Sequence, residues 1–473
     1  MTITMTDKTV LKVISPQDGL TLAEIRTTTQ KELNQIVLKA ENAFRAWKNK
    51  TSRERAQVFY KYKQLLEDNI SELSEIIHKE NGKTIPEAKA EIEKAIEVTE
   101  FACSLPQIIA DEHLEVSKGI ECKISKEPIG VVASITPFNF PSMVPHWTMP
   151  IALTLGNTMI MKPSEKTPLS AVRIADLLAQ AGLPENVFNV VQGEKEMVEA
   201  ICSHEKIKAV SFVGSTAVAK IVYKLCSNNY KRVLCMGGAK NHLVVVPDAD
   251  PDMTASNVAA SFTGCAGQRC MAASVLVAVG KVDHIIEKLV EESRKIIPGK
   301  NMGAIITQEA KNRIEAYINE AEQQGAKILL DGRNSVVPGK EKGFYVGPTI
   351  IDNVTPEMKV AKEEVFGPVL AIIRTNTIDE AIILENASEY GNAAAIFTQS
   401  GGIASDFAKK ASAGMIGVNI GVPVPREPFS FGGINDSRIG VGDITGKSSI
   451  NFWTQPKKIT AKWNPGPQVD WMS

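Results

Sequence analysis

The stretch AVSFVGSTAVAKIVYKL, residues 209–225, contains one complete strand–helix unit. An apolar, β-branched run over 209–213 is followed by a glycine and then by a helical pattern over 217–225. Strand-like runs alternate with helical segments from about residue 130, and the other runs lie at 130–135, 158–161, 187–191 and 242–246. Repeated units of this kind predict an α/β fold, with a doubly wound parallel sheet covered by helices. In such a sheet the ligand lies at the carboxyl ends of the strands.

Different patterns flank this region. Residues 30–104 are helical in pattern, with apolar residues three or four apart, as at Ile36, Ala40 and Phe44. A second α/β stretch follows residue 270, with strand-like runs at 273–279, 326–330, 349–354, 369–375 and 393–398. The tail over 457–463 is typical of one more strand, which could be an ordinary edge strand or could leave the globule and pair with another subunit.

Composition and charge restrict the classes of ligand and partner that we expect for this chain. The chain has 473 residues, is 44% hydrophobic and carries a formal net charge of -1 without a basic stripe, so we expect small-molecule ligands and no nucleic acid. The N-terminus lacks an apolar signal core, and no apolar stretch is long enough to span a bilayer, so we expect neither export nor a membrane partner. The seven cysteines form no C-x-x-C pair and the histidines are unclustered, which favours reduced thiols in a cytoplasm and no metal site.

The segment GCAGQRC, residues 264–270, is the first candidate for chemistry. It joins a helical segment, 253–262, to the strand-like run at 273–279, and such a junction can present the Cys270 thiol to a cleft. An ionised cysteine is a strong nucleophile, and a neighbouring cation such as Arg269 lowers the pKa of a thiol. The alternative is a buried structural cysteine.

A second candidate is Asn139 in ITPFNFP, residues 135–141, where a strand ends between two prolines. A side-chain amide fixed there can donate a hydrogen bond to a developing oxyanion. The alternative is an asparagine that only serves the turn.

Two further motifs, MKPSEKTP (161–168) and FVGST (212–216), also follow strands and precede helices. Lys162 and Glu165 could hydrogen-bond ribose hydroxyls, and a carboxylate there would repel a 2′-phosphate and favour NAD over NADP. Backbone N–H groups and the Ser215 hydroxyl at a helix start suit a pyrophosphate. The alternatives are a charged loop and a simple helix cap. The chain contains no G-x-G-x-x-G fingerprint.

Taken together and in this order, the motifs resemble the aldehyde dehydrogenase superfamily over nearly the whole chain. The matching segments are PFN (137–139), MKPSE (161–165), FVGS (212–215), GQRC (267–270) and EVFGP (364–368). The resemblance implies a modified Rossmann domain for NAD at 1–111 and 131–237 and an α/β catalytic domain at 238–450. It also implies a small β extension for oligomerisation at 112–130 and 451–473, and hence a homodimer or homotetramer.

The resemblance also implies roles for individual residues. Cys270 corresponds to the nucleophile, and the Asn139 amide corresponds to the oxyanion donor together with the Cys270 backbone N–H. Lys162 and Glu165 correspond to the residues that hold the adenosine ribose. The remaining residues expected at the cofactor are Thr136, Phe138, Lys166, Ser215 at the pyrophosphate, Gly237, and Glu364 at the nicotinamide ribose.

One branch of the superfamily fits further segments. GGAKNH (237–242), GCAGQRCM (264–271), GVNIGVPVPREP (417–428) and GDITG (442–446) look like the methylmalonate-semialdehyde dehydrogenases, which transfer the acyl group to coenzyme A (CoA). Hydrolytic relatives carry a glutamate two residues before the paired glycines, and here that position is Cys235, a poor base for activating water. The resemblance therefore implies oxidation of malonate or methylmalonate semialdehyde by NAD through a Cys270 thioester, giving acetyl-CoA or propionyl-CoA.

Three residues are candidates for binding the anionic end of such a substrate. Arg269 could grip a carboxylate through two hydrogen bonds. Lys94 stands where the branch has a second arginine, and lysine lacks the planar fork. His146 replaces an apolar residue expected near the pocket. The last two departures keep open an aldehyde with another anionic group, such as a sulfonate, and the alternative is that both side chains face solvent without a role.

Two other functions remain open at this point. A hydrolytic, NAD-dependent aldehyde dehydrogenase that releases a free acid would share the first half of the reaction. A catalytically silent structural relative is disfavoured because Cys270, Asn139, Lys162 and Glu364 are all retained.

Overall fold

Three of the four N-terminal helices begin after a threonine that caps them. In the computed structural model, which describes residues 10–463, Thr29, Thr51 and Thr84 each form a capping box with a glutamate three residues later. The four helices are α1 (Gln30–Trp47), α2 (Ser52–Asp68), α3 (Ile70–Asn81) and α4 (Ile85–Ile108). The helical prediction for residues 30–104 is therefore confirmed.

The first α/β stretch forms a six-stranded sheet in the order β19-β9-β8-β5-β6-β7. Its strands are β5 (Val131–Ile135), β6 (Thr158–Lys162), β7 (Phe188–Val190), β8 (Ile207–Val213), β9 (Arg232–Met236) and β19 (Arg438–Gly440). All neighbours are parallel except β19, which is antiparallel to β9. The chain leaves β5 towards β6 and β7 and later returns to its other side as β8 and β9. The carboxyl ends of β5 and β8 therefore form the switch point at which doubly wound sheets bind ligands.

Helices cover both faces of this sheet. On one side lie α2, α4, α5 (Met143–Thr154) and α6 (Leu169–Gln180), and on the other side lie α1, α7 (Lys195–Ser203) and α8 (Thr216–Asn228). Alternate strand residues face opposite sides: on β9, Leu234 and Met236 pack towards α2, α4 and α5, whereas Val233 and Cys235 pack towards α1, α7 and α8. Cys235 is thus a core residue of the sheet.

The second α/β stretch forms a seven-stranded sheet in the order β12-β13-β14-β11-β10-β16-β17. Its strands are β10 (Asn241–Val245), β11 (Ala273–Val279), β12 (Lys327–Leu330), β13 (Thr349–Asp352), β14 (Val369–Thr375), β16 (Ala393–Phe397) and β17 (Met415–Val418). Its helices are α9 (Pro251–Thr263), the 3-10 turn η1 (Gly264–Gly267), α10 (Asp283–Arg294), α11 (Gln308–Gln323), α12 (Lys359–Lys362), α13 (Ile378–Asn386) and α14 (Gly401–Lys410).

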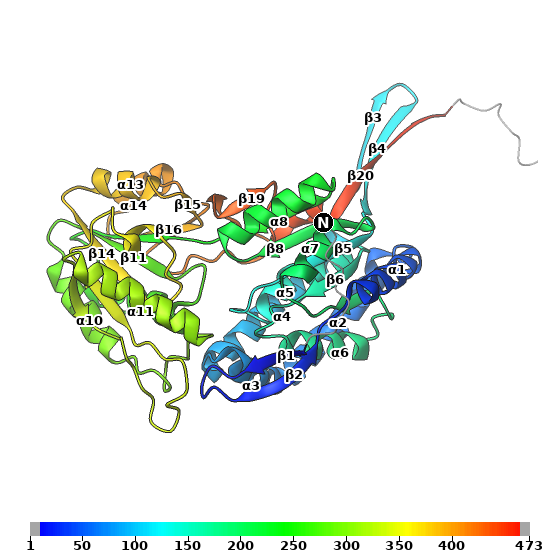
Figure 1. Ribbon diagram of the computed structural model, residues 1–473. Helices are drawn as coiled ribbons and strands as arrows, with labels where there is room; N and C mark the ends of the chain where they lie inside the picture. The colour runs from blue at the N-terminus through cyan, green and yellow to red at the C-terminus, as the bar shows by residue number, and fades with distance from the viewer. Residues whose placement is uncertain (1–9, 464–473) are drawn as a thin grey trace, which may run out of the picture.

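The two sheets lie in two lobes, which Figure 1 shows side by side. By its pattern alone the run at 242–246 was grouped with the first set of strands, whereas the domain boundary implied by the resemblance, 238–450, placed it in the second domain. The corresponding strand, β10, pairs with β11 and β16 in the second sheet, because the chain crosses between the lobes at Gly237 and Gly238. Conversely, β19 and α15 (Gly446–Trp453) return to the first lobe, although the sequence placed residues 238–450 in the second.

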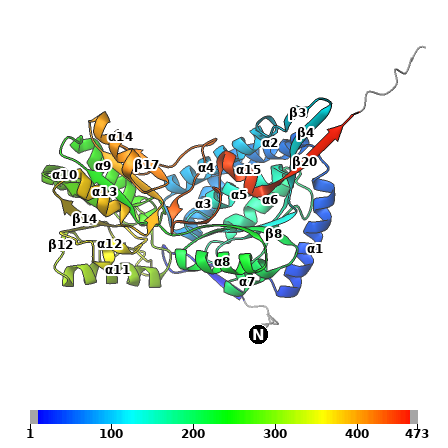
Figure 2. The ribbon, with the colours of Figure 1, turned by 90° about the horizontal axis from the view of Figure 1, so that it is seen from above.

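A three-stranded antiparallel arm projects from the first lobe (Figures 1 and 2). It consists of β3 (Glu112–Ser117), β4 (Ile120–Pro128) and β20 (Thr454–Lys462), with β4 in the middle. The prediction of a strand in the tail is confirmed up to residue 462, and the predicted extension over 464–473 lies outside the described residues.

Short elements complete the fold. The hairpin β1 (Val10–Ile14) and β2 (Thr21–Arg26) was not predicted, and a further pair links β15 (Tyr390–Gly391) to β18 (Ile434–Asn435). Within residues 10–463, no helix combines the length and the apolar character that crossing a membrane requires.

Candidate active site

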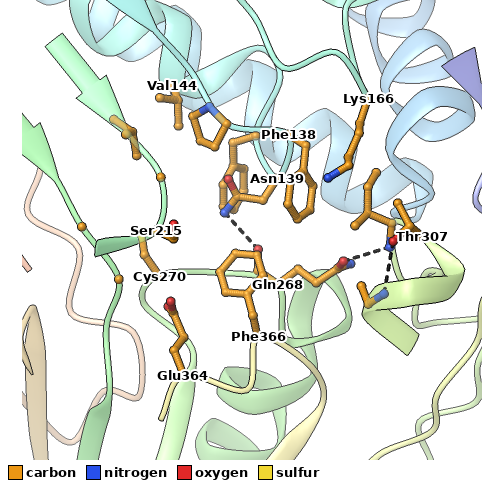
Figure 3. A pocket seen from close by; sticks show the side chains of 18 of the residues that line it. Phe138, Asn139, Val144, Lys166, Ser215, Gln268, Cys270, Thr307, Glu364 and Phe366 are labelled. Carbon is orange, nitrogen blue, oxygen red and sulfur yellow. Dashed lines mark hydrogen bonds between the residues drawn. The ribbon is translucent and has the colours of Figure 1, made fainter. Parts of the chain in front are cut away.

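A cavity of about 470 Å³ opens between the two lobes at the switch point of the first sheet. Its size lies within the range of small-molecule sites, roughly 300–1,000 Å³. The first lobe lines it with the loop after β5 and with the turn between β8 and α8, and the second lobe lines it with the loop after η1 and with the start of α11. Figure 3 shows Asn139, Ser215, Cys270 and Glu364 around this space.

Cys270 is held at the cavity by its backbone. Its carbonyl accepts hydrogen bonds from the side-chain amides of Asn241 (2.8 Å) and Asn392 (2.9 Å). Gly267 allows the preceding turn to pass against the Gly367 carbonyl, where a Cβ atom would clash. Burial and, secondarily, the Glu364 carboxylate raise the pKa of the Cys270 thiol to about 12. In the free protein this cysteine is therefore a protonated thiol at neutral pH.

This raised pKa predicts the pH dependence of alkylation. Only the thiolate reacts with iodoacetamide, so the rate at Cys270 should rise about tenfold per pH unit from pH 7 to pH 10 without a plateau. The measurement is the rate at which the Cys270 peptide is modified in the NAD-free protein, followed by mass spectrometry. A plateau below pH 9 would contradict the assigned environment.

Asn139 faces the loop at 264–270 with its amide group. Its Nδ2 donates a hydrogen bond of 3.0 Å to the carbonyl of Gln268. Since a carbonyl only accepts, this contact fixes the amide with nitrogen towards the loop, and one N–H remains available for an oxyanion. Gln268 is itself held, because its Oε1 accepts the Ile306 N–H and its Nε2 donates to the Ala304 carbonyl.

The geometry at α8 and at the paired glycines suits a bound dinucleotide. Ser215 is the N-cap residue of α8, and its hydroxyl makes no capping hydrogen bond, so the first turn of the helix presents N–H groups towards the cavity. A Cβ atom on Gly237 would lie 2.5 Å from the Asp436 carbonyl, and one on Gly238 would lie 2.6 Å from Glu364 Oε2. Gly238 therefore allows the Glu364 carboxylate to approach the backbone, and Gly237 allows the chain to pass close to Asp436.

Glu364 accepts the Ala239 N–H at 3.1 Å, and burial raises the pKa of its carboxyl to about 7 against the opposing effects of this bond and of Lys240. Lys240 donates to the carbonyls of Val360 (2.7 Å) and Glu363 (2.8 Å). Burial lowers the pKa of Lys240 to about 7. The buried lysine thus anchors the segment that carries Glu364.

The expected ribose residues lie at the end of β6. Lys162 Nζ lies 3.8 Å from Glu165 Oε2 and also donates to the Pro163 carbonyl. Glu165 and Lys166 line a smaller hollow that shares Lys166, Ile306 and Thr307 with the main cavity. Phe138 lines the main cavity, and Lys166 Nζ lies 5.6 Å from the centre of its ring. Thr136 is buried beneath this loop.

The three tentative substrate residues are not among the residues that line the cavity. Arg269 is adjacent to Cys270 in sequence, but its Nη2 donates to the carbonyls of Ala260 (2.7 Å) and Ser261 (2.8 Å) at the end of α9. Lys94 forms ion pairs with Glu97 (2.9 Å) and Glu427 (3.0 Å). The guanidinium and ammonium groups thus have partners within the chain.

His146 is fully buried rather than facing solvent. Its Nδ1 lies 2.7 Å from the Ser142 carbonyl, so this nitrogen carries the proton and Nε2 accepts from the Tyr62 hydroxyl at 2.8 Å. Burial lowers the pKa of His146 to about 4, so the ring is neutral and cannot attract an anion. Both expectations for His146, a pocket residue and a solvent-facing residue, are therefore corrected.

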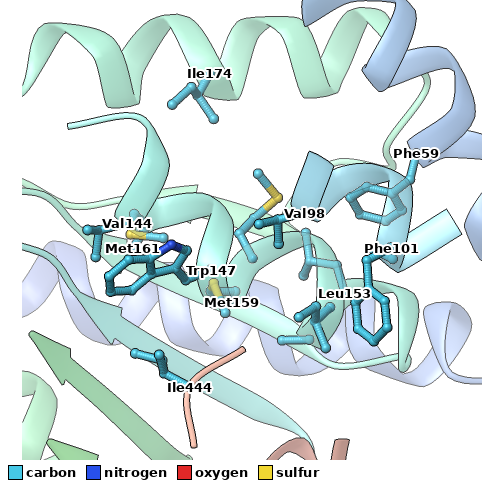
Figure 4. Packing of buried hydrophobic residues seen from close by; sticks show 14 of the residues in the cluster. Phe59, Val98, Phe101, Val144, Trp147, Leu153, Met159, Met161, Ile174 and Ile444 are labelled. Atoms are coloured by element: carbon cyan, nitrogen blue, oxygen red, sulfur yellow. The ribbon is translucent and has the colours of Figure 1, made fainter. Parts of the chain in front are cut away.

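Several cavity residues were not predicted from the sequence. Thr307, Glu309 and Arg313 come from the start of α11, and Phe366 stands edge-on to Phe138 with ring centres 5.9 Å apart. The apolar wall continues from Trp147 into the core of the first lobe (Figure 4). The Thr307 cap of α11 is a recognisable local signal, but nothing in the sequence directs that helix towards Cys270.

Comparisons with known proteins agree with this geometry. The profile of the aldehyde dehydrogenase family matches residues 3–459. The chain is 42% identical over 459 residues to malonate-semialdehyde dehydrogenase 2 of Bacillus thuringiensis (strain Al Hakam), covering 95% of this chain and 94% of that protein. It is 43% identical over 460 residues to the malonate-semialdehyde dehydrogenase of Pseudomonas aeruginosa, covering 95% and 93% of the two chains.

Two solved structures share the fold. One is a provisionally named methylmalonate-semialdehyde dehydrogenase from Sinorhizobium meliloti 1021 in complex with NAD, with a TM-score of 0.96, 41% identity, and coverage of 98% of this chain and 96% of that one. The other is the methylmalonate-semialdehyde dehydrogenase of Oceanimonas doudoroffii, with a TM-score of 0.95, 41% identity and the same coverage of 98% and 96%. The family profile, the relatives and the fold lead to one conclusion: the chain belongs to the aldehyde dehydrogenase family.

Proposed function

We propose that the protein oxidises malonate semialdehyde, or a closely similar short anionic aldehyde, with NAD and transfers the acyl group from Cys270 to CoA. The oxidation is supported by Cys270 and Asn139 at one cavity and by the names of the relatives from Bacillus thuringiensis and Pseudomonas aeruginosa. The acyl transfer rests on one observation, which is the burial of Cys235.

Cys235 occupies the position at which hydrolytic relatives carry the base. Its thiol is fully buried in the core between the first sheet and α7 and α8, and burial raises its pKa well above the usual range. It does not line the cavity. A protonated thiol inside the sheet cannot activate water beside Cys270, so a thioester there would await a stronger nucleophile, and a CoA thiolate is one.

The Cys270 thiol loses its proton to solvent, and its Sγ attacks the aldehyde carbon. The resulting oxyanion accepts hydrogen bonds from Asn139 Nδ2 and the Cys270 N–H. Bound NAD would supply the hydride acceptor, and loss of hydride from this carbon would leave a thioester on Cys270. The sulfur of CoA then displaces Cys270. The carboxylate of the malonyl group leaves as CO2 and a proton takes its place, so the product is acetyl-CoA.

The test is NADH formation from malonate semialdehyde with and without CoA, with the products identified by mass spectrometry. Steady turnover should require CoA and should yield acetyl-CoA, or propionyl-CoA when methylmalonate semialdehyde is supplied. Steady turnover to a free acid without CoA would contradict the proposed acyl transfer.

Hydrolysis is the second candidate, and Glu364 is the observation that favours it. Its carboxyl group lines the same cavity as Cys270, and its pKa of about 7 makes it a competent base near neutral pH. If Glu364 activates water, CoA-independent release of acid should disappear in Glu364→Gln while the first NADH still forms. If Glu364 instead holds the cofactor, the same substitution should weaken NAD binding.

Glu165 is proposed to set the preference for NAD. Its carboxylate lies beside Lys162 and Lys166, is 30% exposed, and would repel a 2′-phosphate. We expect Glu165→Gln to raise the ratio of kcat/KM for NADP to that for NAD by about tenfold, which corresponds to roughly 1.4 kcal/mol. Steady-state kinetics with both cofactors provides the measurement. An unchanged ratio would contradict the proposed position of Glu165 at the ribose.

We further propose a homodimer or homotetramer in the cytoplasm. The arm exposes Leu114, Val116 and Ile459, with exposed fractions of 66%, 49% and 47%, along strands that another subunit could cover. All seven cysteines are free, which suits a reducing compartment. Light scattering of the purified protein would give the oligomeric state, and a monomer would contradict the proposed role of the arm.

A further inference from the structure

The end of α3, the turn after it and the first half of α4 place three charged side chains in the core. Glu80, Lys83 and Glu91 have exposed fractions of 0%, 1% and 2%. Charged groups are rarely buried in this way, because their desolvation is costly unless they are paired and hydrogen-bonded. Their contacts therefore indicate what this segment holds in place.

Lys83 and Glu91 hold the backbone at and just after Asn139. Lys83 Nζ donates to Glu91 Oε2 at 2.6 Å and to the Asn139 carbonyl at 2.8 Å. The other oxygen of Glu91 accepts the N–H groups of Ser142 (2.7 Å) and Met143 (3.0 Å) at the start of α5. One buried ion pair thus fixes the backbone both at Asn139 and just beyond it.

The same segment also contacts the loop at 264–270 and the backbone at Ala304. Glu87 Oε1 accepts the Cys265 N–H at 2.6 Å, and the Gly82 carbonyl accepts the Ala304 N–H at 3.0 Å. Cys265 and Ala266 adopt left-handed backbone angles, with φ of 52° and 53°. Such angles are unfavourable for residues with a Cβ atom and persist only when the surroundings impose them.

Stability alone is a weak reason to keep such an ion pair. A buried pair often contributes no more than apolar residues of the same size, because desolvation offsets the attraction. A role in fixing the geometry of the active site is a stronger reason, because a misplacement of about 1 Å there can slow catalysis by about a hundredfold.

We propose that Lys83, paired with Glu91, is a positioning residue that sets the distance between the Asn139 amide and the Cys270 sulfur. Lys83 acts through the Asn139 backbone and touches no substrate. The proposal rests on the proposed function in one respect, which is that Asn139 and Cys270 form the acylation site.

The test uses 4-nitrophenyl acetate, which acylates Cys270 without NAD, CoA or any aldehyde. Lys83→Met removes the donor to Asn139 and should slow acylation about 10- to 100-fold. Glu91→Gln keeps an acceptor for Ser142 and Met143 but turns an amide donor towards Lys83. It should slow acylation by a smaller factor, and it provides the same test if Lys83→Met does not fold.

Lys231→Met is the matched control. Lys231 is also buried, with an exposed fraction of 8%, and also donates to two backbone carbonyls, those of His204 and Ile207. It precedes β9 at the edge of the sheet opposite the cavity. Its substitution should lower the thermal unfolding midpoint while the acylation rate stays within about twofold of wild type.

A double-variant cycle separates positioning from general damage. If Lys83 acts through Asn139, Lys83→Met should cost little further rate in an Asn139→Ala background. The proposal would be overturned if Lys83→Met slowed acylation by the same factor in the Asn139→Ala background as in wild type. It would also be overturned if Lys83→Met and Glu91→Gln, each as a single variant, acylated at the wild-type rate. Wild-type protein that shows no Cys270-dependent acylation would instead overturn the proposed function on which it rests.

Discussion

Replacing Cys270 by alanine is expected to abolish NADH formation from any aldehyde, by a factor of about 10⁴ or more. Cys270 is the one cysteine among the residues that line the cavity, and its backbone is fixed by Asn241 and Asn392. Without the sulfur no covalent adduct can form, so the aldehyde carbon never reaches the state from which a hydride leaves. The measurement is the pre-steady-state rate of NADH formation per subunit.

Two controls accompany the Cys270→Ala variant. Its affinity for NAD and its unfolding midpoint should remain close to those of wild type, because the residues proposed to hold the cofactor are untouched. Cys122→Ala, in the arm, removes another incompletely buried thiol and should leave the rate of NADH formation unchanged. NADH formation by Cys270→Ala above a hundredth of the wild-type rate would contradict the assignment of the nucleophile.

Asn139→Ala should slow the first turnover about 10²- to 10³-fold, the usual effect of removing one donor from an oxyanion site. The Gln268 carbonyl orients the amide, so that the free N–H of Asn139 is already directed before substrate binds. The loss should appear in the rate of NADH formation at saturating aldehyde rather than in the affinity for NAD.

Asn139→Asp distinguishes this role from a packing role. Aspartate has almost the same shape, but its carboxylate offers no donor and would face both the Gln268 carbonyl and the oxyanion. We therefore expect Asn139→Asp to be slower than Asn139→Ala. If the aspartate variant were faster, because shape matters more than hydrogen bonding, the assignment of Asn139 would be wrong.

The fold and the family could be predicted from the sequence, because the signals that carry them are local. Strand runs, helix caps and the motifs after β5, β6 and β8 each fall within a few residues. The order of these motifs then indicated the family, which the comparisons confirm. The roles of Cys270, Asn139, Lys162 and Glu364 remain predictions until they are tested in the protein.

Strand β10 shows what local signals leave out, because the resemblance placed it in the second domain and the pattern of the run did not. The run HLVVV at 242–246 has the composition of any buried parallel strand. Its sheet is decided by pairing with β11 and β16, more than 30 and about 150 residues later in the chain. No pattern within the run itself contains that information.

The direction of side chains was the second feature that could not be predicted from the sequence. Arg269 is next to Cys270 in sequence, but its guanidinium turns away to donate to the carbonyl groups of Ala260 and Ser261 near the end of α9. The contact of Lys83 with Asn139 could not be predicted from the sequence, because the two residues lie 56 positions apart in the chain. Both cases depend on contacts that the three-dimensional structure alone defines.

A single turnover without CoA tests most directly whether the acyl group forms on Cys270 and waits there for CoA. Protein, NAD and malonate semialdehyde are mixed, NADH is followed, and the Cys270 peptide is examined by mass spectrometry before and after CoA is added. We expect a burst of one NADH per subunit, an acyl group on Cys270 that persists, and its discharge as acetyl-CoA when CoA is added. Continued turnover to free acid with Cys270 unmodified would contradict this expectation.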